Sequence, residues 1–292
     1  LVSPSRGIVV HVHVHKTGGT TLQNLLAAHG LRPVEAHRRS SKCDASSEEP
    51  CITYSLPGRC CWPQDSAAAR LSWAKKRGAR AVHIEWDGVP RNESDITAGG
   101  GFAYVYVVRD PLQRMLSHSQ HRVHEQFANH TLEAKEFVLL NEPWGAPDLY
   151  TRMLIGQRQP EFMDAARGRA LTCADHDTAR RRLSVFVALL LLGYVDRVGA
   201  MLACHVALPD ASLRDVPHLN THHWPGATSA RATLTARHQH WALVTNPLDY
   251  LLYYDALRLM QWQIDEVRSD PQCARFVSSD AALAALADAQ RA

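Results

Sequence analysis

The hydrophobic pattern changes its period early in the chain. Alternating β-branched residues over 8–14 predict a strand, and apolar residues then recur at helical spacing over 22–29. Gly30 lies where such a helix would stop. The segment therefore predicts a strand, a tight turn and a helix.

The same two periods alternate along the rest of the chain. The clearest strand is predicted at 102–108, and a helix follows it from Pro111 to His124. Further strands are predicted at 81–84 and 185–192, and further helices at 65–77, 196–206 and 249–264. This alternation predicts an α/β fold with a central parallel sheet flanked by helices, in one domain spanning 1–292. Residues 31–64 and 207–235 are predicted to be loop-rich.

Composition limits the classes of protein. The chain has 292 residues, 46% of them hydrophobic and 21% charged, which suits one large globular domain. A net charge of +3 is too small to predict nucleic-acid binding. The longest apolar run, 185–192, is far shorter than the roughly 20 residues of a membrane helix, so no membrane span is expected. The start at Leu1 suggests a trimmed chain, with a signal or anchor possible upstream.

The cysteines favour an oxidising compartment. Four of the seven are close together in a segment with little periodicity, where disulfides would replace packing: Cys43, Cys51, Cys60 and Cys61. Zinc binding is the alternative, but the cluster has no pair with C-x₂-C spacing. The sequons at Asn92 and Asn129 are compatible with a secretory route. Because seven is odd, at least one cysteine should be free or pair outside the chain.

The turn after the first strand has the composition of an anion cradle. It consists of Lys16, Thr17, Gly18, Gly19, Thr20 and Thr21. Glycines permit close backbone approach, lysine adds a charge, and a helix N-terminus offers N–H groups. Phosphate or sulfate is the expected ligand. The alternative is an ordinary glycine turn between a strand and a helix. The lysine precedes the glycines, unlike the order of a nucleotide-triphosphatase loop.

A second anion site is predicted after the strand at 102–108. Arg109 leaves the end of this strand, and Ser117 lies two turns along the following helix, so both can face one anion. Arginine offers a planar fork of donors that matches phosphate, and serine adds a hydroxyl. The alternative is an Arg109–Asp110 pair that only caps the helix.

Together the two motifs resemble those of sulfotransferases that use 3′-phosphoadenosine-5′-phosphosulfate (PAPS), especially the heparan sulfate 6-O-sulfotransferases. The stretch 83–86, His-Ile-Glu-Trp, resembles their His-Ala-Asp-Trp, and 151–154, Thr-Arg-Met-Leu, resembles theirs as well. The chain departs from them in having three alternating histidines before the lysine, and the cysteine-bearing segment matches only in character.

This resemblance implies a P-loop-like sulfotransferase fold and transfer of a sulfonate from PAPS to a hydroxyl, with a glycan or polysaccharide as acceptor. Residues 16–21 would hold the 5′-phosphosulfate, and Arg109 and Ser117 the 3′-phosphate. The Golgi lumen would be the location. No nucleic-acid partner and no metal are expected.

His83 is the candidate general base, because imidazole titrates near neutral pH and the family places its base at this position. Glu85 is the second candidate or a partner that orients His83. Lys16 would hold the sulfonate and the bridging oxygen of the leaving nucleotide. The alternative is that His83 is a core histidine bonded to a backbone carbonyl.

The alternating histidines His11, His13 and His15 share one strand face and raise the question of a metal. Neighbours on one face of a strand are roughly 6.6–7 Å apart, which is awkward for three ligands on one ion. Packing of buried histidines against helices is therefore preferred.

Basic residues that could contact an anionic polysaccharide are Arg38, Arg39, Lys42, Lys75, Lys76 and Arg77. The last three also lie at a predicted helix end, where basic residues are favoured anyway. Two other functions stay open: a nucleotide-binding protein without turnover, and a kinase, which the motif order disfavours.

Overall fold

We describe the protein from a computed structural model. The structure describes residues 7–14, 17–28, 30–31, 33–36, 67–84, 89, 96, 101–126, 147–157, 169–186, 188–192, 202, 204, 236–271, 273 and 279–291. All structural statements below refer to these residues.

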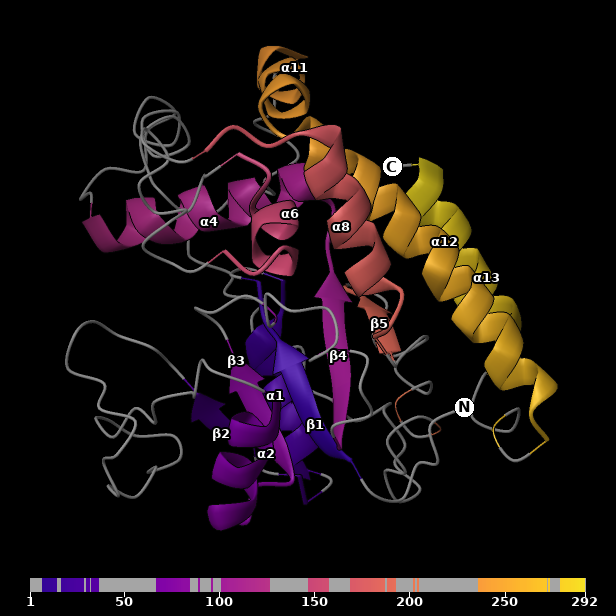
Figure 1. Ribbon diagram of the computed structural model, residues 1–292. Helices are drawn as coiled ribbons and strands as arrows, with labels where there is room; N and C mark the ends of the chain where they lie inside the picture. The colour runs from indigo at the N-terminus through magenta and orange to yellow at the C-terminus, as the bar shows by residue number, and fades with distance from the viewer. Residues whose placement is uncertain are drawn as a thin grey trace.

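A parallel sheet forms the centre of the molecule (Figure 1). Its five strands lie in the order β2-β3-β1-β4-β5. They are β1 (Ile8–Val12), β2 (Pro33–Ala36), β3 (Ala81–Ile84), β4 (Phe102–Val108) and β5 (Ala188–Leu191). Every pairing between neighbours is parallel. The predicted α/β fold with a parallel sheet is therefore confirmed.

Helices flank this sheet. They are α1 (Gly19–Ala28), α2 (Ala67–Lys76), α4 (Pro111–Gln126), α6 (Leu149–Leu154), α8 (Cys173–Leu183), α11 (Ala236–Thr245), α12 (Pro247–Ser269) and α13 (Ser279–Arg291). Figure 1 shows α1 and α2 beside β1–β3, and α12 and α13 along the side of β5. None of the helices described is long and apolar enough to cross a membrane.

Several predicted elements have the expected bounds. The strands β3 and β4 match the predicted ranges 81–84 and 102–108. Gly30 and Gly78 follow the ends of α1 and α2 with φ of 74° and 60°, a left-handed conformation that suits glycine. Backbone N–H groups of the next residues, Leu31 and Ala79, bond back to the carbonyls of Leu26 and Ala74. The predicted stop at Gly30 is therefore confirmed, and Gly78 ends α2 in the same way.

Other elements differ from the prediction. The strand β2 lies inside the region predicted to be loop-rich, so the prediction is wrong there. The strand β5 begins at Ala188 rather than at 185, because Val185 and Phe186 still donate to carbonyls of α8. The predicted helix 196–206 lies outside the described residues except for 202 and 204, which are helical.

The two faces of the sheet differ in character. Register pairs His11 with His83 across β1 and β3, which places these histidines on one face. Tyr106 points to the other face, where its ring centroid lies 6.2 Å from that of Tyr150 and 5.6 Å from that of Phe186. One face therefore carries histidines, and the other an aromatic layer that supports α6.

The long helix α12 fixes the far edge of the sheet. The buried amide of Gln263 accepts a hydrogen bond from Leu189 N and donates one to Phe186 O, at 2.9 and 2.8 Å. A disulfide joins Cys204 to Cys273, with 5.3 Å between their Cα atoms, just beyond the end of α12. Cys173 is an exposed free thiol, which fits the odd cysteine count.

Candidate functional site

The predicted site residues that the structure describes come from three neighbouring strands at one edge of the sheet. The turn that leads into α1 follows β1, His83 precedes the last residue of β3, and Arg109 follows β4. The strands are parallel and adjacent, so their carboxyl ends meet at this edge. The connection after β1 leads toward β2 and the one after β4 leads toward β5, which makes the edge between them a topological switch point. Such points are where open α/β sheets bind ligands.

Buried contacts fix the conformation of the turn after β1. Thr17 is fully buried, and its hydroxyl donates to Val14 O at 2.7 Å. Gly18 has φ of 83°, and a Cβ on it would overlap the side chain of Leu192, which follows β5. The turn therefore needs glycine at position 18 for its own packing, independently of any ligand. Thr20 is exposed and Thr21 is half-buried, so the first turn of α1 reaches the surface.

His13 lies directly under the start of α1. Its Nε2 accepts a hydrogen bond from Gly19 N at 3.1 Å, and a Cβ on Gly19 would overlap the imidazole ring. The second glycine of the motif is therefore required by a histidine of the preceding strand. The N–H groups that follow in the first turn have no carbonyl partner within the helix, and with the helix dipole they can hold an anion.

Three buried histidines form one cluster, which we call the histidine cluster: His11, His13 and His83. The three ring centroids lie 4.7–5.4 Å apart. His83 is 2% exposed, and its Nδ1 lies 2.9 Å from Nδ1 of His11, a hydrogen-bonding distance. The bond described for His83 is thus to another imidazole, whereas the structural alternative was a bond to a backbone carbonyl. Through His13, the cluster links the candidate base to the turn over residues 16–21, the predicted anion site, which we call the anion turn.

The second predicted anion site lies at the end of β4. Arg109 is partly buried, burial lowers the pKa of its guanidinium, and its carbonyl accepts a hydrogen bond from the Tyr150 hydroxyl at 2.7 Å. Asp110 caps α4, because its Oδ1 accepts from Gln113 N at 2.8 Å. Asp110 therefore has the capping role that was the alternative for this pair. Ser117 is half-buried on α4.

Arg114 is a residue of this region that the sequence reasoning missed. Its side chain is fully buried, and its Cζ lies 5.6 Å from the ring centroid of Tyr150. Arg114 is five positions after Arg109, on the buried side of α4. A signal was available, since a basic residue at Arg114 falls on the apolar face of the predicted helix, next to Met115.

Behind Tyr150, two aspartates cap each other's helices, and we call them the carboxylate pair: Asp148 and Asp249. Asp249 lies in the first turn of α12, and its carboxylate accepts from Tyr150 N and Thr151 N at the start of α6, each at 2.9 Å. Asp148 precedes α6, and its Oδ1 accepts from Leu248 N and Asp249 N at the start of α12, at 2.9 and 3.0 Å. Each aspartate therefore caps the helix to which the other belongs.

Burial changes the electrostatics of this pair. Burial, and then the neighbouring carboxylate of Asp148, raise the pKa of Asp249 to about 7. Burial also raises the pKa of Asp148. The backbone N–H groups that both side chains accept from act in the opposite direction and favour the ionised forms.

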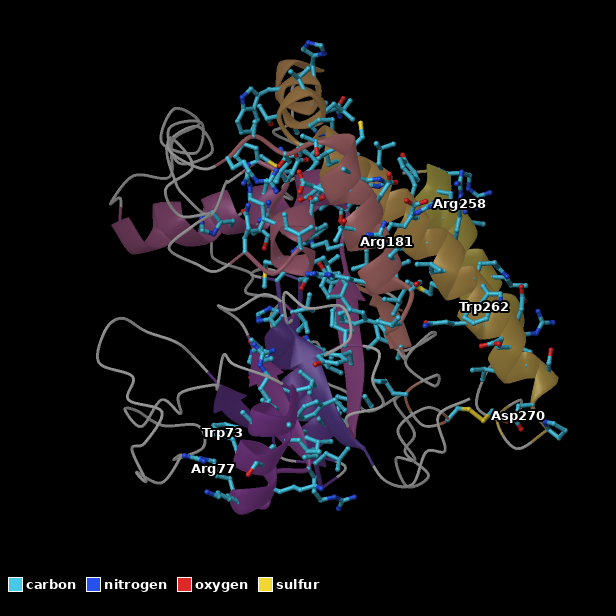
Figure 2. All side chains as sticks on the ribbon, in the orientation of Figure 1. Trp73, Arg77, Arg181, Arg258, Trp262 and Asp270 are labelled. Carbon is cyan, nitrogen blue, oxygen red and sulfur yellow. A yellow bond between two sulfur atoms is a disulfide. The ribbon has the colours of Figure 1, made fainter. Side chains whose placement is uncertain are left out.

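Some predicted residues lie outside the described ones, so their predicted roles stay predictions. They are Lys16, Glu85, His15, Cys43, Cys51, Cys60, Cys61, Asn92, Asn129, Arg38, Arg39 and Lys42. Among the basic residues that are described, Arg77 stacks on Trp73 at the end of α2, with its Cζ 4.4 Å from the ring centroid (Figure 2). The described ranges contain no group of three or more His, Cys, Asp or Glu side chains able to hold a metal ion.

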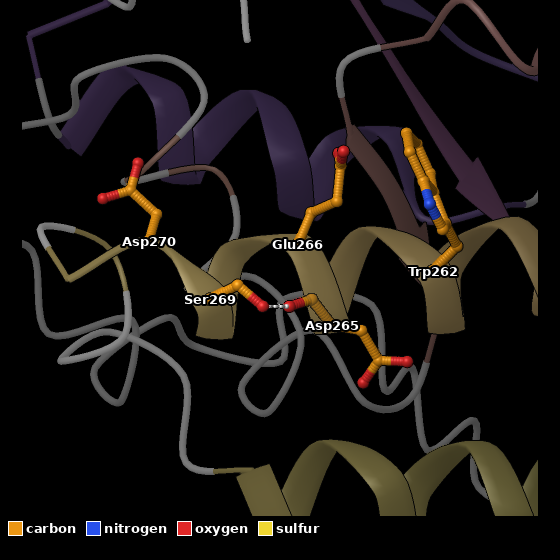
Figure 3. Close-up of a pocket in the computed structure, with 5 residues that line it drawn as sticks. All are labelled: Trp262, Asp265, Glu266, Ser269 and Asp270. Carbon is orange, nitrogen blue, oxygen red and sulfur yellow. Dashed lines mark hydrogen bonds between the residues drawn. The ribbon is translucent and has the colours of Figure 1, made fainter.

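A cavity of about 480 Å³ lies elsewhere, along the last turns of α12 (Figure 3). The residues described as lining it are Trp262, Asp265, Glu266, Ser269 and Asp270. Ser269 Oγ donates to the carbonyl oxygen of Asp265 at 2.8 Å. None of these lining residues belongs to the predicted site.

The sequence matches no protein-family model, and no curated protein is significantly similar to it.

Proposed function

We propose that this protein is a sulfotransferase that moves a sulfonate from PAPS to a hydroxyl of a glycan or polysaccharide. One observation supports the proposal: the turn after β1, the candidate base on β3 and Arg109 after β4 lie on three adjacent parallel strands, whose carboxyl ends share one edge of the sheet, with the switch point between β1 and β4. PAPS carries two anionic groups, the 5′-phosphosulfate and the 3′-phosphate, and each needs a binding site of its own. The acceptor hydroxyl needs a base near the site that binds the 5′-phosphosulfate. We further propose the P-loop-like sulfotransferase form of the α/β fold.

The reaction assigns one role to each group. The acceptor O–H bond breaks and its proton passes to His83, while the acceptor oxygen forms a bond to sulfur. The bond from sulfur to the bridging phosphate oxygen breaks, and 3′,5′-adenosine bisphosphate leaves with the electron pair. Lys16 and the first turn of α1, including Thr20 and Thr21, neutralise charge on the sulfonate and the leaving oxygen. Arg109 and Ser117 hold the 3′-phosphate.

The secretory pathway, with the Golgi lumen as the compartment, is part of this proposal. The disulfide between Cys204 and Cys273 supports it, because such bonds persist in oxidising compartments. The loop that it closes spans 69 residues, for which chain entropy predicts a stabilisation of about 4 kcal/mol.

A second function is favoured by one specific observation, the burial of His83. The residue is 2% exposed and its ring is bonded to His11, so an acceptor hydroxyl reaches the ring only by displacing what covers it. A protein that binds the nucleotide without turnover needs no such access. This alternative keeps the donor site and removes the reaction.

Nucleotide calorimetry tests the donor site that both functions share. We expect 3′,5′-adenosine bisphosphate to bind about 10- to 100-fold more tightly than AMP, because a charge-assisted contact contributes roughly 1.5–3 kcal/mol. Arg109→Ala should remove this preference. Arg258→Ala, at a side chain 81% exposed on α12, is the matched control and should leave it unchanged. Equal affinities for the two nucleotides would refute both functions.

Turnover then separates the two. Radiolabelled PAPS is offered with a panel of glycans, small alcohols, phenols and tyrosine peptides. Label transferred to a glycan supports the sulfotransferase. Tight nucleotide binding with no transfer to any acceptor supports the binding protein.

A further inference from the structure

The hydrogen bond between His11 and His83 restricts where their protons can be. Two imidazole nitrogens 2.9 Å apart form a hydrogen bond only when one carries a proton and the other offers a lone pair. The two Nδ1 atoms therefore share a single proton. While this bond stands, the two rings together hold at most three ring protons, so the pair carries at most one positive charge.

His13 is restricted independently. Its Nε2 accepts the Gly19 N–H, so its own proton is on Nδ1 and the ring is neutral while that bond stands. The histidine cluster as a whole therefore takes up one proton without rearrangement, and the place for that proton is on the His11–His83 pair.

We propose that His11 is a positioning residue that holds His83 in the Nδ1–H tautomer, and this inference rests on the proposed sulfotransferase function. A general base needs a lone pair on the nitrogen that meets the acceptor hydroxyl. Nδ1 of His83 is engaged with His11, so the reacting nitrogen is Nε2 and the shared proton belongs to His83 Nδ1. His11 then accepts at Nδ1 and carries its own proton on Nε2.

The pairing also serves the step itself. When His83 takes the acceptor proton on Nε2 it becomes an imidazolium, and its Nδ1–H bond to neutral His11 becomes charge-assisted and stronger. His11 thus stabilises the positive charge where it develops, without taking up a proton. The backbone supports this arrangement, because His11 and His83 are register partners on adjacent strands and are both buried.

The experiment reads the tautomers directly, by long-range ¹H–¹⁵N NMR correlation of the full-length protein with ¹⁵N-labelled histidine. In the wild type we expect His83 protonated on Nδ1, His11 on Nε2 and His13 on Nδ1. His83 protonated on Nε2 would overturn the proposal, since His11 would then be the donor and Nε2 of His83 would have no lone pair.

Two variants of His11 separate positioning from packing. In His11→Asn the amide oxygen lies the same number of bonds from Cα as Nδ1, so it still accepts, and His83 should stay protonated on Nδ1. In His11→Leu the acceptor is lost, and His83 should shift its proton to Nε2. His240→Asn, on an exposed face of α11, is the control and should leave His83 unchanged. An unchanged His83 in His11→Leu overturns the proposal, and if that variant does not fold, a shifted His83 in His11→Asn overturns it.

Kinetics give the second readout. His11→Leu should lower kcat about 10- to 100-fold with little change in KM for PAPS, as is usual when a supporting partner of a reactive group is removed, and His11→Asn should restore most of it. Equal activity of the two variants would overturn the positioning role. Failure of the bisphosphate to bind would instead overturn the proposed function, and the tautomers would still show whether His11 orients His83.

Discussion

The histidine cluster and the carboxylate pair are both buried and polar, yet they are held in different ways. In the carboxylate pair, each side chain accepts from backbone N–H groups at the start of a helix. In the histidine cluster, the bond between His11 and His83 joins one ring to another, and His13 accepts a backbone N–H at the anion turn. Groups fixed by backbone at several points support the fold, whereas linked rings can move a proton without breaking a helix or a strand.

This difference predicts that the carboxylate pair contributes to stability and the histidine cluster to activity. Removing a carboxylate leaves buried helix N–H groups without a partner and should lower stability. Changing a ring in the histidine cluster should alter activity first. The predictions below test that division, beginning with the largest effect.

His83→Asn should lower sulfonate transfer by about 10²–10⁴-fold, because it removes the basic nitrogen and keeps a polar side chain of similar width beside His11. The Kd for 3′,5′-adenosine bisphosphate and the melting temperature should stay close to the wild type. Single-turnover kinetics and calorimetry measure the two parts. If binding and stability fell together with transfer, His83 would be a structural residue.

Glu85→Gln, measured in parallel, decides between the two candidate bases. A large loss in this variant, with an active His83→Asn, would assign the base to the carboxylate. A large loss in both would show that they work as an oriented pair.

Asp249→Ala should lower the free energy of unfolding by about 4 kcal/mol, because it leaves two buried N–H groups of α6 without an acceptor and Asp148 without its reciprocal partner. Urea denaturation measures the change. Asp265→Ala, at an exposed position of the same helix, is the matched control and should change stability by less than about 0.5 kcal/mol. Similar losses in both variants would mean that the carboxylate pair does not hold α6.

The pH dependence of stability should carry the signature of Asp249. Its pKa is about 7 in the folded protein, against roughly 3.9 in an unfolded chain. The folded state therefore holds the proton more tightly, so this contribution is complete below about pH 4 and is lost as the pH rises through 7. The loss is at most about 4 kcal/mol.

Unfolding curves recorded between pH 4 and 8 test this sign. Stability of the wild type should fall relative to Asp249→Asn, which has no proton to release at this position. A wild-type curve that rises relative to the variant across this range would contradict the raised pKa.

Asp175 gives the smallest effect, because it is only partly buried and the arginine that pairs with it is 57% exposed. Its carboxylate accepts from Thr172 N at the start of α8, and the bond from Arg169 lowers its pKa to about 2. Asp175→Ala should cost about 1 kcal/mol and Arg169→Ala less, since exposed ion pairs contribute little. Thermal unfolding measures both. A loss as large as that of Asp249→Ala would show that burial is not what separates the two caps.

The elements predicted well are those whose signal lies within their own residues. The apolar β-branched runs of β3 and β4, and the glycines after α1 and α2, are local features, so their bounds could be predicted. The strand β2 has only four residues and begins with a proline, and its place in the sheet comes from pairing with β3. Nothing within that short segment distinguishes it from a loop.

In the candidate site too, only features that lie within consecutive residues could be predicted. The anion turn and Arg109 can be proposed from the sequence, because each belongs to a motif of consecutive residues. The contact between His13 and Gly19, and the pairing of His11 with His83, depend on which strands are neighbours. The helix α6 is a stronger case, because its six residues are capped by an aspartate about a hundred positions later.

The reciprocal caps also set an order of events during synthesis of the chain. Once β4 has left the ribosome, β1 has both of its neighbours in the sheet, so β1, β3 and β4 can assemble early, whereas β5, the second partner of β4, comes later. The carboxylate of Asp148 accepts a hydrogen bond from Asp249 N, which is synthesised 101 residues later. At about 5–20 residues per second this is a delay of roughly 5–20 s. Throughout it the hydrogen bonds that join the start of α6 to the start of α12 cannot form.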